Sequence, residues 1–302
     1  MAEQDVEDFI AFLAASPTPF HAVVSARSRL EAAGFRALAE ADAWDRLAPG
    51  RYFVTTSETN LFAFVLPGER ARFRIVGAHT DSPNLRLKPS AEYTSEGYTQ
   101  LGVEVYGGAL LNSWLDRDLG IAGRVIVRHE HGDGFYSHLV RFDKPLARVP
   151  QLAIHLDREV NEKGLVLDRQ NHLAPVWGLA GAQGLHALIA ETLHVAADRI
   201  ASGDLMLYDV APPAIGGAGG EFLFSARLDN LAMCHAAVTA LCATKDPGSI
   251  AVIALFDHEE VGSNSAAGAG SSTLPRLLER LVVGSAGSRE AFHQACERST
   301  CV

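Results

Sequence analysis

The sequence predicts an α/β protein in which a central mixed sheet, flanked by helices, is interrupted by an inserted β-rich segment. Two observations support this fold class. The run Ile250–Phe256 is wholly apolar and contains several β-branched residues, which is typical of a strand buried on both faces of a sheet. From about residue 90 to 220 the chain changes to short strands punctuated by glycine. We therefore expect one domain from residues 1–89 and 221–302, and a second from residues 90–220.

Length and composition limit the class of protein. The 302 residues are 48% hydrophobic, which is enough for a sizeable core, and the length favours two domains over one. The formal net charge is -10 and the chain has no basic block, so it lacks the electrostatic signature of a nucleic-acid-binding protein. The N-terminus does not resemble a signal peptide, and no apolar run reaches the ~18 residues of a membrane span. These features predict a soluble, cytoplasmic protein.

The N-terminal part of the chain predicts two helices followed by three strands. Residues 5–15 place apolar side chains at helical spacing, and a second helix is expected from about Phe20 to Ala33. Strands are expected at residues 51–56, 61–66 and 73–78. His21 lies at the start of the second helix and could be a ligand, but we interpret it as structural.

Polar residues follow the third of these strands. His79 stands at its carboxyl end, and Asp81 follows two residues later. An imidazole with a nearby carboxylate has the parts of a metal ligand and the group that orients it. Because open α/β sheets bind ligands outside the carboxyl ends of their strands, the position favours a functional role for His79.

The β-rich segment has a different pattern. Strands are expected at residues 103–106, 122–128, 135–140 and 151–155. We interpret the glycine-rich run 216–220 as a flexible linker back to the first domain, because no nucleotide-binding glycine motif is present. No G-x-S-x-G occurs, so a serine hydrolase is not supported.

Three acidic residues stand out after this segment. Asp229 falls beside the start of an apolar helix expected at 231–243, where it could cap the helix or bridge two cations. Glu259 and Glu260 follow the buried strand. Since neighbouring residues leaving a strand point to different sides, one carboxylate could bind a cation while the other acts as general base. A solvated acidic turn is the alternative that this short pair leaves open. Helices at residues 274–283 and 288–296 are expected to follow.

The motifs taken together resemble those of the M18 (aspartyl) aminopeptidase family of zinc metallopeptidases. The resemblance rests on Gly77–Pro83, Ser225–Asn230 and Asp257–Ser263, with further matches at Ser16–His21 and Leu152–Leu156. It covers nearly the whole chain and keeps the family's motif order. It implies a metallo-aminopeptidase that removes N-terminal residues, often acidic, from peptides with a water activated by two zinc ions.

The resemblance also implies roles for individual residues. His79 would bind one zinc ion, Asp229 would bridge both ions, and Glu260 would bind the other. Asp81 would orient His79. Glu259 would act as the general acid and base.

Assembly and completeness are further implications of the resemblance. Residues 90–220 would drive assembly into a dodecamer, in which His155 would contact the substrate of a neighbouring subunit. In the family pattern, an aspartate ligand and a histidine ligand lie beyond the position of Val302. Two expected ligands are therefore missing from this chain, and weakened zinc binding would follow unless His293 substitutes.

Two other functions are alternatives to a zinc aminopeptidase. The first is a truncated, catalytically inactive relative that retains only folding or assembly. The second is a glycosidase using Glu259 and another acid, which is disfavoured because it gives His79 no role.

Overall fold

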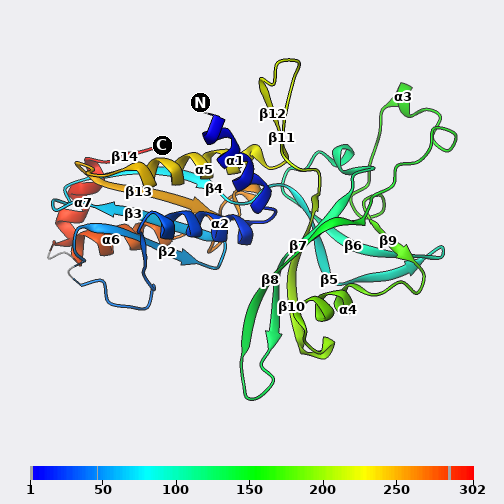
Figure 1. The fold of residues 1–302 in the computed structure, drawn as a ribbon, viewed down its shortest axis with the longest axis horizontal. Coiled ribbons are helices and arrows are strands. Elements are labelled where there is room, and N and C mark those ends of the chain that lie inside the picture. The colour runs from blue at the N-terminus through cyan, green and yellow to red at the C-terminus, as the bar shows by residue number, and fades with distance from the viewer. Residues whose placement is uncertain (1–2, 46, 285–286) are drawn as a thin grey trace. The chain divides into compact units, whose positions relative to one another are not determined.

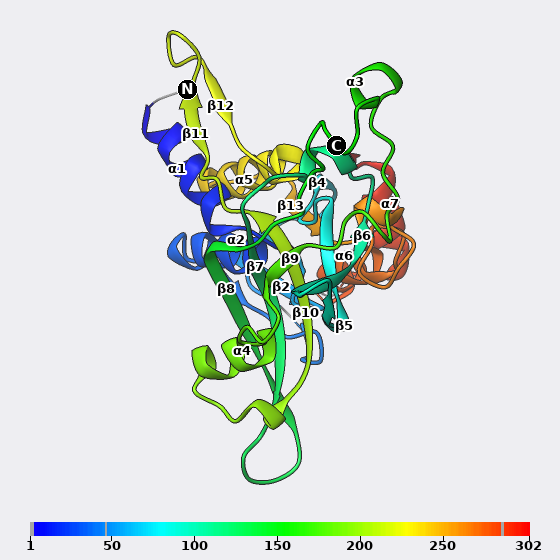
Figure 2. The same ribbon diagram turned by 90° about the vertical axis from the view of Figure 1, so that its right-hand side faces the viewer.

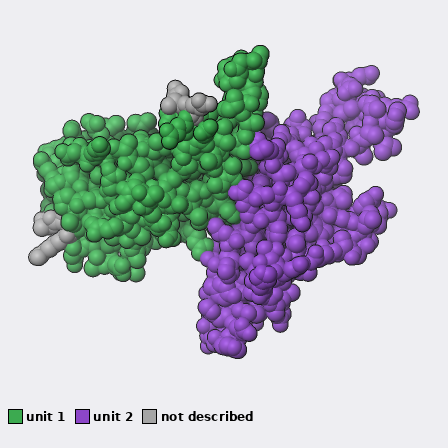
Figure 3. Space-filling view, viewed as in Figure 1, with its two compact units in different colours: residues 1–82, 213–302 green, residues 83–212 purple. Residues whose placement is uncertain are grey.

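The computed structural model describes residues 3–45, 47–284 and 287–302, which form two compact units. Unit 1 combines the residues up to Ser82 with those from Pro213 onward, and unit 2 contains Pro83–Pro212 (Figure 3). Unit 1 is therefore built from two segments that are distant in the sequence.

Unit 1 is organised around a six-stranded mixed sheet of order β1-β2-β3-β13-β4-β14. Its strands are β1 (Arg36–Ala37), β2 (Gly50–Thr56), β3 (Asn60–Leu66), β4 (Phe73–His79), β13 (Ile250–Phe256) and β14 (Thr300–Cys301). Strand β13 pairs antiparallel with β3 and parallel with β4, with Phe256 opposite His79. This register brings the carboxyl ends of β4 and β13 to the same edge of the sheet.

Helices cover both faces of this sheet (Figures 1 and 2). One face carries α1 (Glu3–Ala15), α2 (Pro19–Ala32) and α5 (Leu228–Ala243), and the other carries α6 (Thr273–Val283) and α7 (Arg289–Glu297). Along β13, Ile253 and Leu255 pack with the first group, whereas Val252 and Ala254 pack with the second. Because both faces are covered, the strand is apolar throughout, and the predicted α/β fold is confirmed. None of the helices in the described ranges has the length and apolarity needed to cross a membrane.

Unit 2 contains a six-stranded antiparallel sheet of order β8-β7-β10-β5-β6-β9. Its strands are β5 (Asn84–Ser95), β6 (Tyr98–Tyr106), β7 (Leu119–Arg128), β8 (Phe135–Ala147), β9 (Val176–Leu179) and β10 (Ile200–Asp209). Helix α4 (Leu185–Leu193) places Leu185 and Ile189 in the core of this unit. The connections contain η1 (Leu111–Trp114), α3 (Val160–Lys163) and η2 (Ala197–Arg199).

Two predictions of local structure are wrong. Residues 151–155 were expected to form a strand, but they form no strand, and a turn covers 154–156. Leu152 and Ile154 alternate like the residues of a half-buried strand, yet they are 62% and 46% exposed. The run 216–220 was expected to be a linker. It instead ends β11 (Ala214–Gly216) and forms the turn to β12 (Phe222–Phe224), where Gly217 and Gly220 adopt positive φ angles of 92° and 72° that suit glycine.

Candidate metal centre

Side chains from three separate segments meet at the carboxyl ends of β4 and β13. His79 ends β4, Asp229 lies in the first turn of α5, and Glu259 and Glu260 lie in η3 (Glu259–Val261). One potential ligand atom from each of His79, Glu259 and Glu260 lies within 4.8 Å of the others. The Nε2 atom of His79 is 3.1 Å from Oδ1 of Asp229 and 3.7 Å from Oε2 of Glu259. The structure therefore brings these four predicted residues together.

Asp81 is completely buried beside this cluster. Its carboxylate accepts hydrogen bonds from the backbone N–H groups of Glu259, at 3.3 Å, and Glu260, at 3.1 Å. The same carboxylate lies 3.3 Å from Nδ1 of His79. With Nδ1 held here, Nε2 is the nitrogen available to Asp229 and Glu259. One side chain thus fixes both the imidazole and the loop that follows β13.

The turn after β13 determines where the two glutamates stand. His258 and Ser263 adopt positive φ angles of 62° and 61°, and Gly262 adopts 93°. The N–H of Ser263 donates to the carbonyl of His258 at 2.8 Å, and the N–H of Gly262 donates to that of Glu259 at 2.9 Å. These bonds close a tight turn, in which glycine tolerates the left-handed conformation without a Cβ clash.

Asp229 is held by its backbone, while its side chain is 82% exposed. Its carbonyl accepts a hydrogen bond from Oγ of Ser82 at 2.8 Å. The backbone of Asp229 and Asn230 is not helical, so α5 is kinked at its start and its regular part follows these two residues. One helical turn further on, Sγ of Cys234 donates to the carbonyl of His79 at 3.0 Å, which ties α5 to the end of β4. The carboxylate of Asp229 is therefore available to a ligand.

Electrostatics at this site favour a bound cation. Burial lowers the pKa of His79, but the hydrogen bond and charge of Asp81, with the charge of Glu259, outweigh burial and raise it. Burial raises the pKa of Glu260, and the negative charge of Asp81 raises it further. The shift of His79 reflects the carboxylates beside it, and the shift of Glu260 reflects burial next to the negative charge of Asp81. A divalent cation would supply the missing positive charge, and imidazole with carboxylate donors is the ligand chemistry of catalytic zinc sites. The residues present therefore fit zinc.

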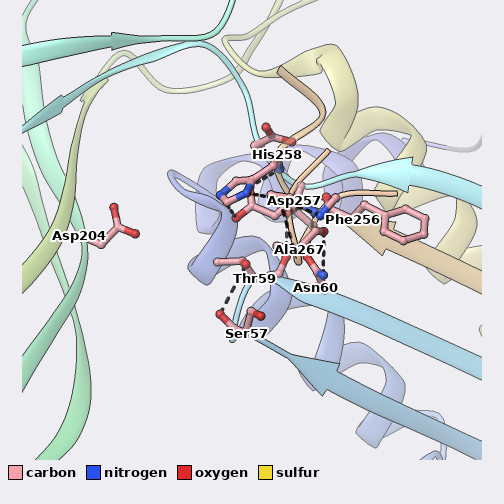
Figure 4. A network of polar contacts seen from close by, with 12 residues as sticks. Ser57, Thr59, Asn60, Asp204, Phe256, Asp257, His258 and Ala267 are labelled. Atoms are coloured by element: carbon pink, nitrogen blue, oxygen red, sulfur yellow. Dashed lines mark hydrogen bonds and ion pairs between the residues drawn. The ribbon is translucent and has the colours of Figure 1, made fainter. Parts of the chain in front are cut away.

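A second polar network adjoins the glutamate loop (Figure 4). Asp257 is buried, and its Oδ1 accepts the N–H of His258 at 2.8 Å. Burial raises the pKa of the Asp257 carboxyl in spite of the nearby imidazole of His258. The Nδ1 atom of His258 lies 2.6 Å from Oγ of Ser265. Sequence reasoning gave no role to this network, because its members are joined by contacts that no local motif displays.

The other histidines considered from the sequence lie elsewhere. His155 is exposed in a turn of unit 2. His293 is exposed on α7 and is outside the donor cluster found among the described residues. The Nδ1 atom of His21 lies 2.8 Å from Oγ1 of Thr18, which is a local contact at the start of α2.

Known sequences similar to this chain are zinc aminopeptidases. The family model described as aminopeptidase I zinc metalloprotease (M18) matches residues 12–302. The "Probable M18 family aminopeptidase 2" of Streptomyces avermitilis is 47% identical, over 98% of this chain and 69% of that protein. The protein of the same name from Mycobacterium leprae is 43% identical, over 94% of this chain and 67% of its own length.

Solved structures with a similar fold include the following aminopeptidases. The mApe1 protein of Chaetomium thermophilum superposes with a TM-score of 0.92 at 32% identity, over 99% of this chain and 74% of that one. A chain in the cryo-EM structure of the Ape4 and Nbr1 complex gives a TM-score of 0.93 at 35% identity, over 99% of this chain and 62% of that one. The S. cerevisiae mApe1 dodecamer gives a TM-score of 0.84 at 28% identity, over 98% of this chain and 70% of that one. The present chain thus spans about two thirds of the length of these proteins.

Proposed function

Because the chain belongs to the M18 family of zinc metalloproteases, we propose that it is a metallo-aminopeptidase whose zinc ligands include His79, Asp229 and Glu260. The observation that carries this proposal is the convergence of His79 with the two glutamates to within 4.8 Å. We further propose that Asp229 bridges two zinc ions. Its support is that the side chain of Asp229 is 82% exposed while its Oδ1 lies 3.1 Å from Nε2 of His79.

The chemistry follows from the surroundings of Glu259. Zinc, when bound, would polarise the scissile carbonyl and acidify the attacking water. Glu259 would take a proton from the attacking water and pass it to the nitrogen of the leaving amine. Its side chain is 54% exposed, so it remains accessible to substrate. Asp81 holds the backbone N–H of Glu259 and the imidazole of His79, so that base and ligand keep their relative positions.

Substrate and assembly form the second part of the proposal. We propose that the substrates are peptides, with acidic N-terminal residues preferred, and that the protein acts as a homo-oligomer assembled through the inserted domain. The S. cerevisiae relative is a dodecamer. Around His155, the apolar Leu152 and Leu156 are 62% and 75% exposed, which favours their burial against another subunit. His155 would then contact the substrate of a neighbouring subunit. The cytoplasmic location stays a prediction.

Metal titration and a peptide-release assay test the proposed function. Calorimetric titration with zinc should give two ions per chain, and His79→Ala should abolish binding at one of them. A stoichiometry of one would contradict the bridging role of Asp229.

The zinc-saturated protein should release N-terminal aspartate or glutamate from short peptides faster than leucine or lysine. Bound zinc without release of any residue would refute the aminopeptidase and favour the inactive alternative. Light scattering tests the assembly, since a folded monomer of 32.3 kDa would contradict it.

A further inference from the structure

A buried amide joins β3 to the loop that carries the two glutamates. Asn60 is the first residue of β3 and is 0% exposed. The rest of the strand, Leu61–Leu66, is apolar and buried. A side-chain amide in such a position is costly unless both of its ends are hydrogen-bonded. The partners of Asn60 therefore show what the residue does.

Both ends of this amide are bonded, and to opposite ends of one loop (Figure 4). Oδ1 accepts the backbone N–H of Asp257 at 2.8 Å. Nδ2 donates to the backbone carbonyl of Ala267 at 2.9 Å. Asp257 is the first residue after β13, and Ala267 lies beyond the turn that contains Glu259. A single short side chain thus ties the start of the loop to its end.

Backbone hydrogen bonds also tie the last part of this loop to the residues that follow it. The N–H of Gly268 donates to the carbonyl of Ser265 at 3.1 Å, and the N–H of Gly270 donates to that of Ser263 at 3.0 Å. Gly268 packs so closely that a Cβ would lie 2.1 Å from the carbonyl oxygen of Ser263. Asn60 therefore closes a loop whose last turn is already held by backbone hydrogen bonds.

We propose that Asn60 is a positioning residue, which sets where Glu259 and Glu260 stand relative to His79 by closing the loop from 257 to 267. Asp81 holds the same loop at its middle, through the N–H groups of the two glutamates. The catalytic meaning of this inference rests on the proposed function, but the order of the loop can be measured without metal or substrate. The alternative is that Asn60 only pairs two buried backbone groups and contributes to stability.

The test compares Asn60→Leu with Leu61→Ala. Leucine is close in size to asparagine but forms neither hydrogen bond, so the N–H of Asp257 and the carbonyl of Ala267 lose their partner. Leu61 is the next residue and is also fully buried, but it packs toward α2 and α5 rather than toward the loop. Its truncation leaves a core cavity and so serves as the stability control.

The first measurement is hydrogen exchange over residues 257–268 in the metal-free protein. It is made well below the melting temperatures of Asn60→Leu and Leu61→Ala. Asn60→Leu should speed exchange there by roughly tenfold or more, because local opening no longer breaks the two bonds of Asn60. Leu61→Ala should leave exchange in this segment near the wild-type rate. The second measurement is zinc affinity, which should fall about 10- to 100-fold in Asn60→Leu and much less in Leu61→Ala.

Asn60→Ala is a second variant for the case that Asn60→Leu does not fold. Its smaller side chain also forms neither hydrogen bond but leaves room for water beside the N–H of Asp257 and the carbonyl of Ala267, so faster exchange of residues 257–268 is again expected. If residues 257–268 exchanged at the same rate in the Asn60 variants as in Leu61→Ala, the positioning role would be overturned. Faster loop exchange in a protein that hydrolyses no peptide would leave the positioning role standing and refute the proposed function.

Discussion

Replacing Asp81 by asparagine should separate the organisation of this site from the stability of the fold. The carboxylate of Asp81 accepts two backbone N–H groups, from Glu259 and Glu260, and also faces Nδ1 of His79. Asparagine offers one acceptor oxygen and one NH₂ group, and the NH₂ group cannot accept from a donor. At least one of the three contacts must therefore be lost.

The size of the effect follows from the strength of that contact. A hydrogen bond to a charged group contributes about 1.5–3 kcal/mol, which corresponds to roughly 10- to 150-fold in an equilibrium constant. Removing the buried negative charge also removes part of the attraction for a cation, so both effects weaken zinc binding. We expect Asp81→Asn to lower zinc affinity about 10- to 100-fold.

Isothermal titration calorimetry with zinc measures this change, and thermal unfolding of the metal-free protein measures stability in parallel. Asp257→Asn is the matched control, because Asp257 is also a buried aspartate at a strand end. Its Oδ1 accepts the N–H of His258, a bond that an asparagine oxygen can keep. If both variants lost zinc affinity equally, or if Asp81→Asn bound zinc like the wild type, the organising role of Asp81 would be refuted.

Three further predictions concern the base, the loop and the N-terminal helix. Glu259→Gln should lower peptide turnover by roughly 10²–10⁴-fold with zinc content nearly unchanged; equal loss of both would make Glu259 a ligand instead. Gly268→Ala should destabilise the protein by about 1–3 kcal/mol in urea unfolding, since its Cβ would meet the carbonyl of Ser263 at 2.1 Å, and an unchanged midpoint would contradict that contact. Burial opposes ionisation of Asp8, but the hydrogen bonds and charges of Arg29 and His235 prevail and lower its pKa below the ordinary value of 3.8. The stability difference between wild type and Asp8→Asn should therefore be present near neutral pH and shrink as the pH falls through about 4 toward 3, and a difference independent of pH would refute the ion pair.

Several features of the fold could be predicted because they depend on local pattern. The strand Ile250–Phe256 was evident because burial on both faces leaves no position for a polar residue. The family was evident because three short motifs recur in a fixed order, and that assignment is confirmed. Local pattern failed at residues 151–155, whose alternating apolar side chains are exposed rather than paired in a sheet. It also did not identify α4 or β10, whose burial depends on partners in unit 2.

The sequence by itself determined that this is an α/β member of a zinc metalloprotease family, with acidic and imidazole groups at the ends of two strands. Only the tertiary structure decided how those groups meet. The parallel pairing of β4 with β13 places Phe256 opposite His79, and this register lets Asp81 reach the N–H groups of Glu259 and Glu260. The physical reason is that hydrophobic periodicity reports which face of an element is buried, whereas a hydrogen bond depends on the relative positions of elements far apart in the chain. The amide of Asn60 depends on such positions too, since its partners Asp257 and Ala267 adjoin it only once β3 and β13 have paired.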